Sequence, residues 1–140
     1  MKTVTVSCSP VTPPNASGWV EEMERTSVRA WAQRTQRERM GSRMSDEGIA
    51  WWSDMMGRTA LSTVHAYMNW VGSIDIREDI KRIQCPTLVM IGDNGPLHQV
   101  EEIAAWQKTI RHSELEVIPG DGWHAGGARP DLCAPMTAAF

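Results

Sequence analysis

Two β-rich segments in the second half of the chain constrain its fold more than any other feature. Residues 87–91 form a continuous run of mostly β-branched or aliphatic residues that is typical of a strand buried on both faces, and Asp93 follows it closely. Residues 99–110 have helical spacing, and residues 114–118 are typical of a second strand that leads to His124. Strand, helix and strand in this order favour a parallel sheet, in which both carboxyl ends lie at one edge. We therefore expect Asp93 and His124 to lie close together at that edge.

The first half of the chain is predicted to be one strand followed by helices. A short β-rich run over residues 3–9 is closed by a cluster of turn residues. Helical spacing begins at Ser17, a candidate N-cap, and two further helices are expected after Ser45 and over residues 58–71. A connector over residues 74–83 then leads to the strand that begins after Pro86, because the residue before a proline avoids the helical region.

This order of elements predicts the α/β fold class, with a short parallel sheet of about three strands and a helical cap insertion over its carboxyl edge. We expect one domain overall, because 140 residues is an ordinary length for one. Residues 1–16 would form the first core strand and a linker, and residues 17–74 the helical cap insertion. Residues 75–140 would form the carboxyl-terminal α/β core segment, which ends in a weak helix over residues 130–140.

Composition excludes several classes of partner and location. The net charge of −3 gives no reason to expect nucleic acid or an anionic membrane as a partner. No apolar run approaches the roughly eighteen residues that a membrane span needs. The start of the chain alternates polar and apolar residues instead of forming the apolar core of a signal peptide. We therefore expect a cytoplasmic protein.

The cysteines and two of the histidines lack the spacing of a metal site. Cys8, Cys85 and Cys133 are odd in number and far apart, so we expect buried thiols in a reducing compartment. His98 and His112 fit no familiar zinc pattern and are expected at the surface. We expect neither a metal nor a cofactor.

Aromatic usage is unusual, with seven Trp and nine Met beside one Phe and one Tyr. Trp51, Trp52 and Trp70 are interpreted as packing residues, although a cap cavity lined by Trp and Met would suit a small apolar or cyclic substrate. His65, on the third predicted helix of the insertion, is expected to face either that cavity or the cap interior.

Several motifs follow one another in the second half of the chain. They are the run Cys85-Pro86-Thr87-Leu88-Val89 that continues to Gly92, a helix with Trp106, the run Glu114-Leu115-Glu116-Val117-Ile118-Pro119, and Gly122-Trp123-His124 followed by Pro130-Asp131. In this order they resemble the carboxyl-terminal part of an α/β-hydrolase. The insertion that carries Trp19 is similar to the lid of the branch containing 3-oxoadipate enol-lactonases. The resemblance implies that residues 3–9 are the sixth strand of that fold and that residues 17–72 are its cap.

Family chemistry uses a serine on a G-x-S-x-G turn, a histidine that takes its proton and an acid that orients the histidine. The resemblance implies that His124 is this histidine. Asp93 is the candidate acid, although the family usually places the acid three residues after the strand-ending glycine, where this chain has Gly95. A turn-forming role for Asp93 remains the alternative, and Asp121 ranks below it as the acid.

The 140 residues contain no G-x-S-x-G, so the nucleophile and its oxyanion donors are missing. We expect little hydrolysis from this chain alone, because the parts of such a site act as a unit. The first interpretation is a truncated carboxyl-terminal portion of a hydrolase for small apolar esters or lactones. The alternative is a non-catalytic module that binds a small ligand or dimerises, and a remnant of a broken gene ranks third.

The first strand leads to an expectation about partners. In the family sheet this strand has a neighbour on its outer side, and no residues in this sequence precede it to supply one. An unpaired edge offers backbone groups to another chain. We therefore expect a homo-oligomer or a complementing chain that bears the nucleophile.

Overall fold

A computed structural model describes residues 4–7, 11, 18–95, 97–120 and 122–140 of the chain. Three parallel strands form one sheet in the order β1, β2, β3, with β1 at Val4–Ser7, β2 at Thr87–Gly92 and β3 at Ser113–Ile118. The predicted fold class is therefore confirmed, together with its sheet of about three strands. The central strand β2 is buried along its whole length, which explains its mostly aliphatic sequence.

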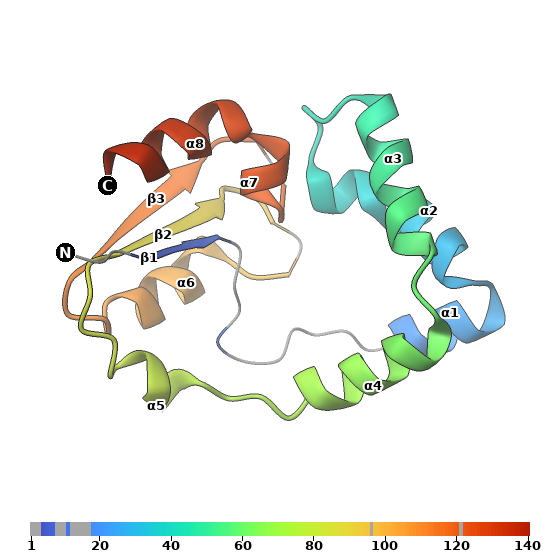
Figure 1. Cartoon of the computed structure of the whole chain (residues 1–140), viewed down its shortest axis with the longest axis horizontal. Coiled ribbons are helices and arrows are strands. Elements are labelled where there is room, and N and C mark those ends of the chain that lie inside the picture. The colour runs from blue at the N-terminus through green and yellow to red at the C-terminus, as the bar shows by residue number, and fades with distance from the viewer. Residues whose placement is uncertain (1–3, 8–10, 12–17, 96, 121) are drawn as a thin grey trace.

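Helices cover both faces of this sheet (Figure 1). Helix α6 (Val100–Gln107) packs on one face against Val89 and Ile91, and α8 (Pro130–Ala139) packs on the other against Leu88 and Met90. Alternate residues of β2 therefore serve opposite layers, as the period of two in a strand requires. Each layer buries aliphatic side chains worth roughly 2 kcal/mol apiece.

Four helices form the cap: α1 (Trp19–Arg25), α2 (Val28–Met40), α3 (Asp46–Gly57) and α4 (Leu61–Val71). The sequence predicts one helix where α1 and α2 occur, and this prediction is wrong because Thr26 and Ser27 interrupt it. The Ser27 hydroxyl accepts a hydrogen bond from the backbone N–H of Ala30 and thereby caps α2. The expected N-cap of the first helix, Ser17, lies outside the described residues.

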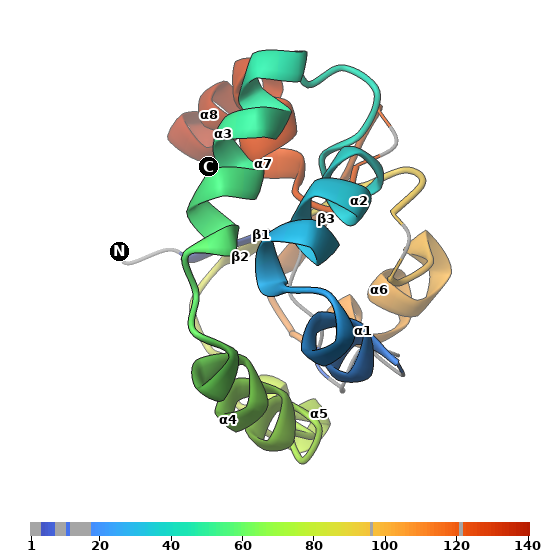
Figure 2. The ribbon, with the colours of Figure 1, turned by 90° about the vertical axis from the view of Figure 1, so that its right-hand side faces the viewer.

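The cap lies beyond the carboxyl ends of the strands (Figure 1), and Figure 2 shows α2 near the middle of this side with the strands behind it. Its own core joins Met23 of α1, Trp31 of α2 and Val64 of α4. Two short helices complete the chain, α5 (Arg77–Ile80) in the connector and α7 (Ala125–Ala128) directly after His124. The sequence did not predict α7, because its two glycines disfavour a helix.

The structure also describes two of the three cysteines that the sequence predicts to be buried. Cys133 is buried and Cys85 is half-buried, both as free thiols, while Cys8 lies outside the described residues. In the part of the chain that the structure describes, no helix has the length and apolar character needed to cross a bilayer. The same residues contain no group of three potential metal ligands.

Candidate active site

The loop that carries His124 is bound to the end of a cap helix. The backbone N–H groups of Trp123 and His124 both donate to the carbonyl of Arg39, at 2.7 and 3.1 Å. This carbonyl belongs to the last turn of α2, where helix carbonyls lack partners within the helix. A Cβ atom added to Gly122 would lie 2.8 Å from the carbonyl oxygen of Met40, so the two backbones meet without room for a side chain.

The side chain of Arg39 also contacts the ring of His124. Its Nη2 lies 3.2 Å from the Nε2 of His124, and the ring is half-buried. Because a guanidinium only donates, Nε2 must accept, and the neutral ring then carries its proton on Nδ1. A histidine that serves as base to a serine uses this same tautomer.

Burial of the ring and the positive charge of Arg39 lower the pKa of His124 from 6.5 to about 4. Burial also lowers the pKa of Arg39, which nevertheless stays charged at neutral pH. His124 is therefore neutral at pH 7, which is the state required of a general base.

Lowering the pH from 6.5 to 4 should destabilise the fold through His124. The unfolded ring protonates near its ordinary pKa of 6.5, whereas the folded ring protonates near 4. Because the unfolded state binds more protons between these values, the free energy of unfolding is highest above pH 6.5 and decreases toward pH 4. The whole difference corresponds to about 3 kcal/mol, which solvent screening of the partly exposed ring reduces to about 1 to 2 kcal/mol.

Urea unfolding at several pH values checks this expectation, with His124→Gln as the comparison. The variant should lose this part of the pH dependence, because glutamine does not titrate. Equal slopes for both proteins between pH 6.5 and 4 would show that His124 does not carry the effect.

A cavity of about 550 Å³ lies between the cap and the His124 loop. Apart from Arg39, His124 and a few hydroxyl groups, its walls are apolar and aromatic. Members of this lining are Trp19, Met23, Trp31, Met56, Tyr67, Met68 and Trp123. Such a mainly apolar cavity with few convergent polar groups is typical of a small-molecule site.

The tryptophans that line this cavity differ from those the sequence suggested. Trp51, Trp52 and Trp70 are 56%, 39% and 62% exposed, so their interpretation as packing residues is wrong. His65 neither lines the cavity nor points into the cap core, and its Nε2 lies 3.0 Å from a carboxylate oxygen of Glu24 on the surface of the cap.

Asp93 lies at the end of β2, beside the end of β3, as the sequence predicts. Its exposed carboxylate accepts a hydrogen bond of 3.1 Å from the backbone N–H of Gly120, in the loop that leads to His124. No carboxylate of the described residues bonds to the ring of His124. The position that the family usually gives to the acid is Gly95, which is buried against Trp123. Asp121 lies outside the described residues.

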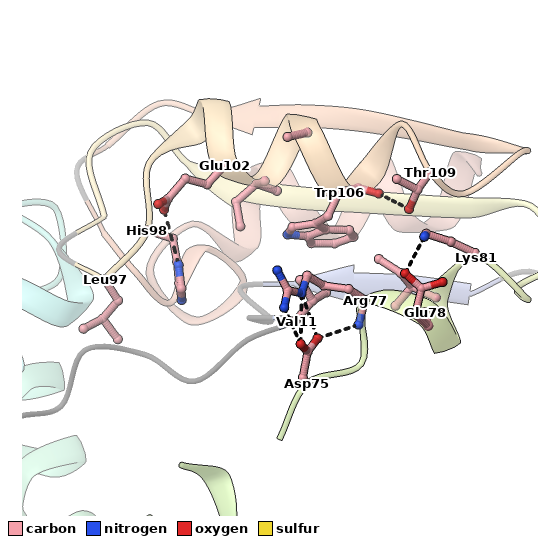
Figure 3. A pocket seen from close by; sticks show the side chains of 13 residues that line it. Val11, Asp75, Arg77, Glu78, Lys81, Leu97, His98, Glu102, Trp106 and Thr109 are labelled. Carbon is pink, nitrogen blue, oxygen red and sulfur yellow. Dashed lines mark hydrogen bonds and ion pairs between the residues drawn. The ribbon is translucent and has the colours of Figure 1, made fainter. Parts of the chain in front are cut away.

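A larger cavity of about 800 Å³ lies elsewhere, between α5 and α6 (Figure 3). Its charged residues pair with one another, as in Arg77 with Asp75 and Lys81 with Glu78, and it does not include His124. His98 lines it with a side chain only 12% exposed, so the prediction that His98 lies at the surface is wrong. We place the candidate site in the smaller cavity, which contains His124 in the loop after β3.

Arg39 is the residue of this site that sequence reasoning missed. It follows Arg37 and Glu38, which suggests a solvated helix face. A signal is nevertheless present, because Arg39 recurs at helical spacing with Trp31 and Thr35, which are buried on the inner face of α2.

Comparisons with known proteins agree with this architecture. No protein-family model matches the sequence. A putative non-heme chloroperoxidase of Synechocystis is 40% identical over 103 residues, which cover 72% of this chain and 37% of that protein. Among solved structures, a hydrolase from Oleispira antarctica matches 99% of this chain and 55% of its own length, with a TM-score of 0.83 and 20% identity.

Two other solved structures share the fold at lower identity. The enol-lactonase from Burkholderia xenovorans matches all of this chain and 56% of its own length, with a TM-score of 0.83 and 14% identity. A bromoperoxidase from Bacillus anthracis matches 99% of this chain and 57% of its own length, with a TM-score of 0.83 and 13% identity. This chain thus spans little more than half of each of these structures. The chain has the α/β-hydrolase fold, of which it comprises the helical cap and the carboxyl-terminal part.

Proposed function

We propose that this chain supplies the cap cavity and the general base of a hydrolase for small apolar esters or lactones. The observation that carries the proposal is a neutral histidine in a mainly apolar cavity at the carboxyl ends of parallel strands. Solved neighbours described as an esterase and an enol-lactonase support this substrate class.

In the proposed reaction His124 takes the proton of a serine hydroxyl as it attacks the ester carbonyl, and later returns it to the leaving oxygen. The serine lies in a segment outside these 140 residues, because they contain no G-x-S-x-G. Asp93 holds the loop of His124 through the N–H of Gly120 and is the proposed acid of the site. Arg39 must release Nε2 before the serine can donate to it.

The proposed source of the serine is a chain segment that pairs with β1. Among the described residues β1 pairs only with β2, so its outer edge offers backbone donors and acceptors. A complementing segment would extend the sheet there, and in its absence a second copy of this chain would occupy the same edge.

A second candidate function is binding without turnover. The observation that favours it is the contact between Arg39 and Nε2 of His124, which occupies the lone pair that a base needs. In this case no serine segment is required, and the cavity retains a small ligand unchanged.

Complementation tests the first function. The chain is mixed with the amino-terminal part of the Synechocystis relative, up to the point where the similarity begins, and hydrolysis of a nitrophenyl ester is followed together with the mass by light scattering. We expect oligomers without turnover from the chain alone, and a mixed complex with turnover from the pair. A mixed complex that hydrolyses nothing would favour the binding function, and a stable monomer of the chain alone would contradict the proposed role of the β1 edge.

A further inference from the structure

Arg39 is a cation in the cap cavity that has no anionic partner among the residues that the structure describes. Its guanidinium donates to the sulfur of Met56 at 3.1 Å and to Nε2 of His124 at 3.2 Å, both neutral acceptors. It lies 5.3 Å from the centre of the Trp31 ring, and its buried Nε has no hydrogen-bond partner. No carboxylate of the described residues bonds to it.

Other arginines of the chain are arranged in the opposite way. Six of those with a carboxylate partner lie near the surface, where pairing contributes little. They are Arg29, Arg34, Arg37, Arg58, Arg77 and Arg82. The side chain of Arg129 is only 13% exposed, and it too pairs with a carboxylate, that of Asp131. Arg39, which lines an apolar cavity, is the arginine for which an unpaired charge costs most. A half-buried cation in a mainly apolar cavity, with no counter-ion among the described residues, indicates that the counter-ion belongs to the ligand.

We propose that the cap cavity binds a small organic monocarboxylate whose carboxylate pairs with Arg39 and whose apolar body lies among the tryptophans and methionines. The guanidinium fork matches a planar carboxylate, and its terminal N–H groups meet only neutral acceptors, which a carboxylate would replace. A single cation neutralises a single negative charge, whereas a phosphate would leave a second charge in apolar surroundings. This inference rests on the proposed function because it places the ligand in the same cavity. It does not require that the ligand be hydrolysed.

A bound carboxylate has a second effect at His124. It competes with Nε2 for the N–H groups of Arg39, so it releases the lone pair that the base needs. It also places a negative charge near the ring, which raises the pKa of His124 from its low value. A substrate with a carboxylate would therefore free the base as it binds.

Calorimetry with phenylacetate and its neutral isostere phenylacetamide tests the proposal on the 140-residue chain. We expect the acid to bind about 10 to 100 times more tightly than the amide, which is the usual contribution of a charge-assisted bidentate pair. Arg39→Met should remove this preference and leave the two ligands equal. Arg34→Met, on the same helix but at the surface in an ion pair with Glu22, should keep it.

Two outcomes distinguish this inference from the proposed function. Equal binding of acid and amide to the unaltered chain would overturn the inference and leave the cavity as a ligand site. Binding of neither would overturn both. If Arg39→Met does not fold, NMR titration of His124 in the unaltered chain decides, because phenylacetate should raise the pKa of the ring and phenylacetamide should not.

Discussion

Replacing His124 with alanine should lower kcat/KM of the complemented assembly by about 10⁴-fold or more. Without the imidazole, nothing takes the proton of the attacking serine, and loss of one member of such a unit removes most of its effect. The measurement is ester hydrolysis by the mixed complex under identical conditions, with the mass of the complex verified for each variant. The matched control is His112→Ala, because His112 is exposed and serves the fold through its backbone carbonyl.

The variant Asp93→Asn separates positioning from proton transfer. It should lower the rate less than the loss of His124 and leave the acidic limb of the pH profile in place. The reason is that Asp93 acts on the loop through the N–H of Gly120, whereas the pKa of His124 is set by burial of the ring and by Arg39. A loss of less than tenfold with His124→Ala would rule out this histidine as the base, whatever the effect of Asp93→Asn.

Replacing Gly92 with alanine should destabilise the chain by about 4 kcal/mol or more. Gly92 ends β2, and a Cβ atom added there would overlap the carbonyl oxygen of Gly122 in the His124 loop. The backbone fixes the position of the Cβ atom, and the oxygen is itself a backbone atom. Neither can rotate away, so the strand or the loop must shift. The midpoint of urea unfolding, followed by circular dichroism, measures the loss.

Gly95→Ala is the matched control in the same loop. Its added Cβ would meet the nearest atoms, both of Trp123, at 3.6 Å, an ordinary contact distance. We expect a change within about 0.5 kcal/mol. Similar losses for the two variants would mean that the close approach of Gly92 and Gly122 is not what requires glycine.

The core of the fold could be predicted from the sequence because its signals are local. Four aliphatic residues in succession mark β2, and the alternation of strand and helix determines a parallel sheet. The break between α1 and α2 was missed, since apolar spacing continues through Ser27 and only the cap formed by its hydroxyl reveals the new helix start.

The candidate site was predictable only in part. His124 and Asp93 follow strands that pair in register, so their common edge could be inferred from the order of elements. Arg39 is separated from His124 by 85 positions and reaches it through the packing of the cap, which no local pattern encodes. The exposure of Trp51 and Trp70 depends likewise on how the cap helices pack against one another.

The double hydrogen bond from Trp123 and His124 to the carbonyl of Arg39 connects the cap to the loop at the carboxyl ends of the strands. Because the last turn of α2 holds the loop by its backbone, any hinge motion that lifts α2 also displaces the imidazole. Entry to the cavity by such a motion would therefore also move the proposed base away from its position beside the cavity.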